Sequence, residues 1–274
     1  MINQKLLLFL QGCFAFSGRN NIDDTLEGDT GDAMLYNGIL LSSPIPFDNA
    51  NELKTAVTDS FDAQCRPYRC PNYVGKDTVN TFSRDMLIGF LHYLITTKDS
   101  NLASEFYAWL KSNRMDMCAG SATDNRGKIT PSMWGIIGDV WAYIGLNRPW
   151  YYWLWRWSDG VVLLLSAMFT PKGYQKHLIS QHIWLRYRIG VKSRLISRVL
   201  YWSDKDNDWY KLLSELNGKN RSGVYKEILS KCNDKEIEWK GPGDDWLLTN
   251  PRCKEPCGHD ILFLQLFIKY LLEI

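Results

Sequence analysis

The chain has 274 residues, of which 45% are apolar, enough to bury a sizeable core. Its formal net charge is only +2, and the locally basic segment Arg186–Arg198 spaces its charges like the solvent face of a helix, which argues against nucleic acid as a partner. Twelve Trp and 14 Tyr are an unusually large share. Most of them are expected in the core, but their flat faces also suit the CH-rich side of a sugar ring.

The first 18 residues contain an apolar run of signal-peptide length, interrupted by Gln11 and Gly12. We therefore favour a structural helix or strand over a cleaved signal. Next, "GDTGDAM" places Asp29 and Asp32 three residues apart, ahead of a predicted helix over 31–42. This acidic pair leaves three interpretations open, namely a helix cap, a cation site and part of a catalytic site.

Apolar residues then recur with helical period along most of the chain. The pattern predicts a helix over 50–63, a second helix that follows Ser83 as its N-cap, and a third over 102–110. A further helix opens with Thr130 as N-cap and Pro131 at the first helical position. The later predicted helices cover 174–189, 193–202, 207–218, 222–232 and 258–273.

The run from Pro149 to Phe169 is long enough to cross a bilayer. Arg156, Asp159 and Gly160 interrupt it, and charges near the middle of a bilayer are costly. We therefore expect no membrane span, but a helix in a very apolar centre.

Two kinds of helix alternate. One kind is apolar and contains Gly, as in "DAMLYNGILL", "RDMLIGFLHYLI" and "GVVLLLSAMF"; the other is amphipathic and charged, as in "NELKTAVTDSFDA". A helix that is apolar all round is buried, and an amphipathic one covers it. The alternation predicts an all-α fold, a single (α/α) toroid domain of helical hairpins over residues 1–274. An irregular helical bundle is the alternative.

An Asp stands at or near the start of most apolar helices, namely Asp32, Asp85, Asp159 and Asp260, with Asp139 about two turns into its helix. In a toroid the inner helices are parallel, so these carboxylates would converge on one rim of the central cavity. The competing explanation is capping, because Asp at a helix start accepts from free N–H groups and meets the positive end of the helix dipole.

"GDTGDAM" resembles the Asp-Ala-Gly-Asp motif of inverting glycoside hydrolases of family nine, which belong to the six-hairpin glycosidases. "FSRDMLIG", Phe82 to Gly89, is similar to helix openings of toroidal uronide hydrolases. By this resemblance Asp29 and Asp32 would hold and activate the attacking water. The Glu-containing C-terminal signature of family nine is missing, so the resemblance does not supply the catalytic acid.

Inverting hydrolysis needs acid and base carboxyls roughly 6.5–9.5 Å apart, and retaining hydrolysis roughly 5–5.5 Å. Asp29 and Asp32 are too close in sequence to provide the acid as well, so a second hairpin must supply it. Asp85 is our first choice and Asp139 the second; Glu255 and Asp260, near the end of the chain, are the third, with His259 beside them. Arg84 is expected to meet a substrate carboxylate or to hold Asp85 ionised. Trp134, Trp141 and Trp150 are candidate sugar platforms.

The leading hypothesis is a glycoside hydrolase acting on a polysaccharide or oligosaccharide, with no cofactor and no metal. A polysaccharide lyase on the same fold is the nearest variant, and "RPYRCPNYVGK", Arg66 to Lys76, holds residue types for its base and neutraliser. A non-catalytic scaffold or carbohydrate-binding protein of a virion or cell envelope is the third possibility. An extracellular or virion location is favoured over a cytoplasmic one.

The seven Cys follow no zinc spacing. Disulfides involving the pairs Cys65 and Cys70, and Cys253 and Cys257, remain open. Cys13 and Cys118 are expected as small buried residues.

Overall fold

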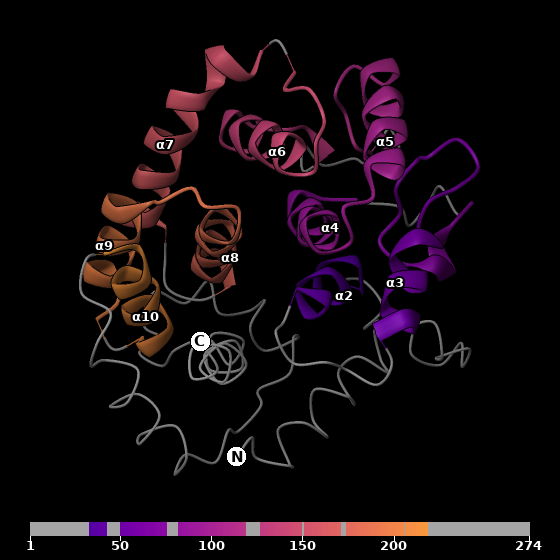
Figure 1. The fold of residues 1–274 in the computed structure, drawn as a ribbon. Helices are drawn as coiled ribbons and strands as arrows, with labels where there is room; N and C mark the ends of the chain where they lie inside the picture. Colours follow the sequence, from indigo (N-terminus) through magenta and orange to yellow (C-terminus); the bar gives the residue numbers. More distant parts are fainter. Residues whose placement is uncertain are drawn as a thin grey trace, which may run out of the picture. The chain divides into compact units, whose positions relative to one another are not determined.

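The structure is a computed structural model, and it describes residues 33–42, 50–75, 82–118, 127–149, 151–170, 174–205 and 207–218 (Figure 1). Across these ranges the regular elements are helices. Strand-like pairing there is confined to the isolated bridges Phe61–Pro67 and Asp116–Lys128. The prediction of an all-α chain is confirmed for this part of the sequence.

The helices are α2 (Ala33–Leu41), α3 (Ala50–Thr58), α4 (Arg84–Thr97), α5 (Ser100–Ser112), α6 (Pro131–Tyr143), α7 (Tyr152–Phe169), α8 (Tyr174–Arg188), α9 (Arg194–Ser203) and α10 (Asp208–Asn217), with a short 3-10 turn at Pro71–Tyr73. Their ends follow the expected local signals. Ser83 is the N-cap of α4, Thr130 precedes Pro131 at the start of α6, and Gly218 ends α10. The predicted helix over 50–63 is too long, since α3 ends at Thr58. The predicted helices over 222–232 and 258–273 lie outside the described residues.

The described residues divide into two compact units. One contains those up to Trp155 and the other those from Arg156 onward, so the boundary falls inside α7. The single-domain prediction therefore stays a prediction.

In the unit that contains α2 to α6, α4 is the most enclosed helix. Every residue from Asp85 to Ile95 is buried, and α4 contacts α2, α3 and α6. Its contact with α2 is made by backbone. A Cβ atom placed on Gly38 would lie 1.8 Å from the Gly89 carbonyl oxygen, and one on Gly89 would lie 2.3 Å from the Leu35 Cα. Glycine at both positions lets the two helices approach this closely.

Helix α5 covers this unit with one face. Its buried residues are Ala103, Phe106, Trp109 and Leu110, spaced as one stripe of a helix. Phe106 packs edge-on against Phe90 of α4, with ring centroids 5.1 Å apart, and Tyr107 packs against Trp141 of α6 at 6.2 Å. Within this unit, enclosed helices and amphipathic covering helices follow each other as the sequence pattern predicts.

In the unit that begins at Arg156, α10 packs against both α9 and α8. The Trp209 indole of α10 lies 5.8 Å from that of Trp184 and donates from Nε1 to the Ser180 hydroxyl at 2.8 Å. Helix α8 is enclosed although its composition is polar. Its buried polar side chains are Lys176, His177, Ser180, Gln181, His182 and Arg186.

Helix α7 contradicts the expectation that "GVVLLLSAMF" forms a buried helix. Leu163 and Ala167 are buried, but most of its large apolar side chains are exposed: Trp153, Leu154, Trp157, Val161, Leu165, Met168 and Phe169. Apolar residues occupy nearly the whole circumference of α7, so only part of them can face the protein. The apolar composition of α7 does not indicate which of these side chains face the protein.

None of the described helices has the length and apolarity needed to cross a membrane, as expected from the interrupted run at Pro149–Phe169.

Candidate functional site

Several of the predicted site residues lie outside the described residues: Asp29, Asp32, Trp150, Glu255, His259 and Asp260. The same holds for the Asp159 side chain. Helix α2 is described from Ala33, the residue after Asp32 in the sequence, to Leu41. The acidic pair therefore remains a prediction, and the site has to be built from Asp85 and Asp139.

Asp85 lies in the first turn of α4 and is 8% exposed. The Ser83 hydroxyl donates a hydrogen bond to its Oδ1 atom. Ser83 is the N-cap residue, and its side chain makes no capping bond to the backbone. The Ser83 hydroxyl thus donates to the Asp85 carboxylate, which lies at the positive end of the helix dipole, where negative charge is favoured. This arrangement suits a capping acid as well as a catalytic one.

Arg84, the predicted partner of Asp85 or of a substrate carboxylate, is exposed, whereas Asp85 is buried. Consecutive helical residues point about 100° apart around the axis and do not face each other. The geometry therefore favours Arg84 as a group that meets solvent or substrate over one that holds Asp85 ionised.

Asp139 is the more enclosed acid, with 5% of its surface exposed in the middle of α6. Its Oδ1 atom accepts a hydrogen bond of 2.5 Å from the Tyr152 hydroxyl. Its Oδ2 atom is buried and has no hydrogen-bond partner among the described residues. This oxygen keeps the capacity for one more hydrogen bond.

Tyr152 is held in place around this carboxyl. The Arg148 guanidinium lies 5.0 Å from the centroid of its ring. A Cβ atom at Gly138 would come within 2.2 Å of the ring, so glycine next to Asp139 makes room for the tyrosine. The Asp139–Tyr152 contact therefore depends on Gly138 as well as on its own two residues.

The predicted sugar platforms Trp134 and Trp141 belong to one aromatic row along α6. Trp134 packs against Tyr151 with centroids 4.4 Å apart, Tyr151 lies 6.4 Å from Tyr107, and Tyr107 lies 6.2 Å from Trp141. Trp134 is half-buried, whereas Trp141 exposes only 3% of its surface. A platform for sugar needs an accessible face, which favours Trp134.

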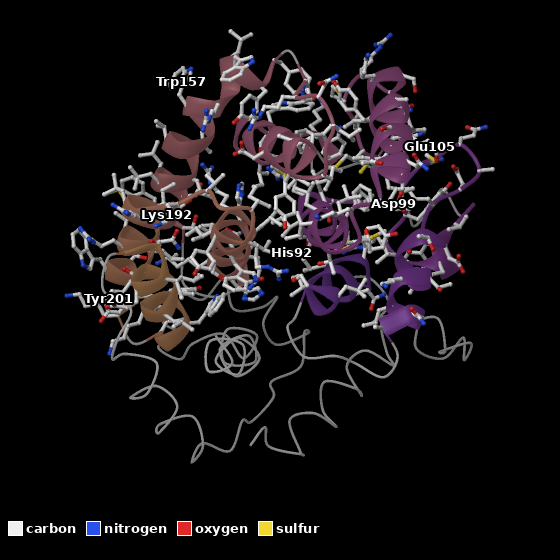
Figure 2. The ribbon with its side chains drawn as sticks, in the orientation of Figure 1. His92, Asp99, Glu105, Trp157, Lys192 and Tyr201 are labelled. Atoms are coloured by element: carbon white, nitrogen blue, oxygen red, sulfur yellow. The ribbon has the colours of Figure 1, made fainter. Side chains whose placement is uncertain are left out.

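Two further polar residues accompany Asp139 on the enclosed helices of this unit and were not predicted. Asn37 of α2 is 1% exposed, and within the described part of the chain neither its amide nitrogen nor its amide oxygen has a hydrogen-bond partner. His92 of α4, labelled in Figure 2, is completely buried. A polar residue inside an otherwise apolar helix was the signal available in the sequence, but His92 was interpreted there as part of an apolar stripe.

The described cysteines have structural surroundings. The Cys65 thiol donates to Glu105 at 3.1 Å, so no disulfide joins Cys65 to Cys70. Burial raises the pKa of Cys65 to about 11, and the bond to Glu105 acts in the same direction. Cys118 is 2% exposed, which confirms it as a small buried residue, and Cys13, Cys253 and Cys257 lie outside the described residues.

Within the described ranges, no group of three or more His, Cys, Asp or Glu side chains is placed to hold a metal ion. The candidate site described above consists of buried carboxyls, a tyrosine hydroxyl and aromatic faces.

Comparison with known proteins adds no family. No protein-family model matches the chain, and no curated protein or solved structure matches it significantly. Function has to be argued from the residues described above.

Proposed function

We propose that this protein cleaves glycosidic bonds in a polysaccharide or oligosaccharide by general acid–base catalysis. The observation that carries the proposal is the pair of buried carboxyls on neighbouring enclosed helices, Asp85 on α4 and Asp139 on α6; the Oδ2 atom of Asp139 has no hydrogen-bond partner among the described residues.

Asp139 is suited to exchange a proton with a substrate. The Tyr152 hydroxyl occupies and orients Oδ1, which leaves Oδ2 to donate to or accept from another group. A glycosidic oxygen needs a positioned acid before its bond breaks, and a water needs a positioned base. We assign Asp139 to one of these roles and Asp85 to the other. The acidic pair Asp29 and Asp32, by its resemblance to family nine, would hold the attacking water.

The toroid belongs to this proposal. Its support is the order of enclosed and covering helices in the unit of α2 to α6, where α4 contacts both α2 and α6 and α5 covers α4 and α6 through aromatic contacts. Parallel inner helices of a toroid would place the starts of α2, α4 and α6 on one rim. Trp134, half-buried in the aromatic row, is our choice of sugar platform.

The lyase variant has less support. It requires a tyrosine or histidine that gives up its proton easily, and its candidate segment contains Tyr68. Burial is the main reason that the pKa of Tyr68 is raised, which is opposite to what a base requires. Tyr68 also donates to Asp62 at 3.3 Å and stacks under Arg66, an arrangement typical of a structural residue.

A non-catalytic scaffold is the competing function, and one observation favours it. Asp85 lies in the first turn of α4, where a carboxylate interacts favourably with the helix dipole whether or not it takes part in catalysis. Activity has to decide between a scaffold and an enzyme.

The test is release of reducing ends from a panel of neutral and uronate-containing glycans. We expect Asp139→Asn and Asp85→Asn to lower turnover by at least about 100-fold, the usual contribution of a general acid or base. Asp99→Asn is the matched control, because Asp99 is the N-cap of α5 and accepts from the Leu102 amide. It should keep full activity. Wild-type protein that cleaves no glycan, together with acid variants that only lose stability, would establish the scaffold instead.

A further inference from the structure

Helix α9 exposes an unusual combination of side chains. Its inner side is formed by Ile196, Ser197 and Leu200, which are buried. Its outer side carries Arg194, Leu195, Arg198 and Trp202, all exposed, with Leu195 at 58% and Trp202 at 59%. Spacings of one, four and eight residues place these four side chains on one stripe of the helix. Two guanidinium groups therefore alternate with two large apolar groups on the same exposed surface.

The charged residues of α9 itself have one sign. Lys192 precedes α9 and Lys205 follows it, and both are exposed (Lys192 is labelled in Figure 2). No acidic residue occurs from Gly190 to Ser203. Beyond α9, Lys205 lies in the sequence between two acids, Asp204, which is 5% exposed, and Asp206. The three exposed cations Lys192, Arg194 and Arg198 fall on about two turns of chain, in contrast with a net charge of only +2 for the whole protein.

The same unit presents a second apolar surface. From Arg156 onward α7 exposes Trp157, Val161, Leu165, Met168 and Phe169, at 70%, 47%, 48%, 49% and 75%. The Trp157 ring is labelled in Figure 2, where it points away from the helix. These residues lie on one broad side of α7, and the buried Leu163 and Ala167 lie on the other. Exposed apolar surface of this extent indicates an interaction site.

We propose that the exposed stripes of α9 and α7 bind the surface of an anionic lipid bilayer. Arginine and lysine on α9 would meet lipid phosphates, and Trp202 and Leu195 would enter the interfacial layer, where tryptophan is favoured because its ring is apolar and its N–H is polar. The exposed side of α7 supplies further apolar area. The protein lies on the bilayer in this arrangement and does not cross it.

The side chains favour a bilayer over the other anionic surface, nucleic acid. Single-stranded nucleic acid is bound by cations and aromatic rings, on which bases stack. Leu195 on α9 and Val161, Leu165 and Met168 on α7 have no function in such stacking, whereas a bilayer interface accommodates aliphatic and aromatic groups together. A second copy of this chain would bring a second basic α9 stripe and hence like-charge repulsion.

Vesicle sedimentation tests the proposal. Full-length protein is mixed with vesicles of phosphatidylcholine alone or with a quarter phosphatidylglycerol, and binding is expected only to the latter. Each basic residue near an anionic surface contributes about 1 kcal/mol, so Arg194→Gln with Arg198→Gln should lower the partition coefficient roughly 30-fold. The matched control is Lys54→Gln with Lys128→Gln, which removes the same charge from exposed positions on the other unit and should bind as wild type.

A second pair of variants tests the apolar contribution. Trp202→Gln and Trp157→Gln should each weaken binding to the mixed vesicles without changing the thermal unfolding midpoint, because both side chains are exposed. Equal binding to both vesicle types, equal loss in the two charge-variant pairs, or absence of vesicle binding with tight binding to single-stranded oligonucleotides would each overturn the proposal. So would an assembly in solution that is dissociated by Trp157→Gln while vesicle binding is absent.

Discussion

The contact between Asp139 and Tyr152 is the best-defined interaction of the candidate site. A carboxyl that is 5% exposed and accepts one hydrogen bond of 2.5 Å has exchanged bulk water for a single donor. The free energy of the buried carboxyl therefore depends on the Tyr152 hydroxyl much more than that of an exposed carboxyl would depend on any one partner. The question is whether Asp139 and Tyr152 stabilise the protein jointly or independently.

A double-mutant cycle answers this question. Tyr152→Phe removes the one hydrogen bond that the described residues donate to the Asp139 carboxyl and should lower the free energy of unfolding by about 1–3 kcal/mol. Asp139→Leu in the Tyr152→Phe background should cost less than it does alone, because both polar groups are then replaced together. Urea unfolding measures all four proteins, and strictly additive losses would show that the two residues act independently.

His182 of α8 gives a prediction about pH. Burial, with a smaller contribution from Arg186, lowers the pKa of His182 from 6.5 to about 3. Between these values the unfolded chain takes up a proton that the folded protein does not, so stability is greatest above pH 6.5 and falls as the pH is lowered toward 3. The loss from this residue is about 1.4 kcal/mol per pH unit well below the higher pKa.

The measurement is the free energy of unfolding at several pH values from 7 to 4.5. His182→Asn removes this titration, so the difference between wild type and variant should shrink steadily as the pH falls. Parallel curves over that range would contradict the assignment of a buried neutral imidazole.

At the scale of elements, the closest packing in the structure is that of α2 on α4. Gly38 and Gly89 allow backbone to touch backbone, and a methyl group at Gly89 would lie 2.3 Å from both the Leu35 Cα and the Met34 carbonyl oxygen. Backbone cannot rotate out of the way as a flexible side chain can. The two helices would have to separate, and the apolar contacts between them would be lost.

Gly89→Ala is accordingly expected to destabilise the protein by about 3 kcal/mol or more. Gly160→Ala in α7 is the matched control, since no heavy atom lies within 4 Å of the position that its methyl group would take, and it should raise stability by roughly 0.5–1 kcal/mol through helix propensity. Thermal unfolding followed by circular dichroism compares the two. A small effect at both positions would mean that α2 and α4 are not in backbone contact.

Helix ends were predicted from the sequence more accurately than the burial of whole helices. Ser83, Thr130 with Pro131, and Gly218 predicted three helix ends correctly, because helix ends depend on the conformational preferences of residues adjacent in the sequence. The burial of α7 and α8 was not predictable in this way. Apolar residues around most of α7 left its exposed side undetermined, and α8 is buried with polar residues whose partners, such as Ser180 with Trp209, come from distant sequence.

For the molecule as a whole, the all-α class followed from the helical period, whereas the toroid needs long-range contacts that no local pattern contains. Asp85 and Asp139 were named from the sequence as candidate catalytic acids, and both side chains are buried on enclosed helices. Asn37, His92 and Tyr152 were missed as site residues, because a single polar or aromatic residue in an apolar helix has no distinctive spacing. Their relevance appears only when α2, α4 and α6 belong to one compact unit.

The proposed function gives Asp139 a role in catalysis and not only in stabilising α6. It is tested most directly with a glycan that the wild-type protein cleaves, by measuring binding and turnover of that glycan by Asp139→Asn at a temperature where the variant is fully folded. For Asp139→Asn we expect glycan binding to stay within a few-fold of wild type and turnover to be lowered by at least about 100-fold. Turnover at the wild-type rate by the folded variant would contradict it.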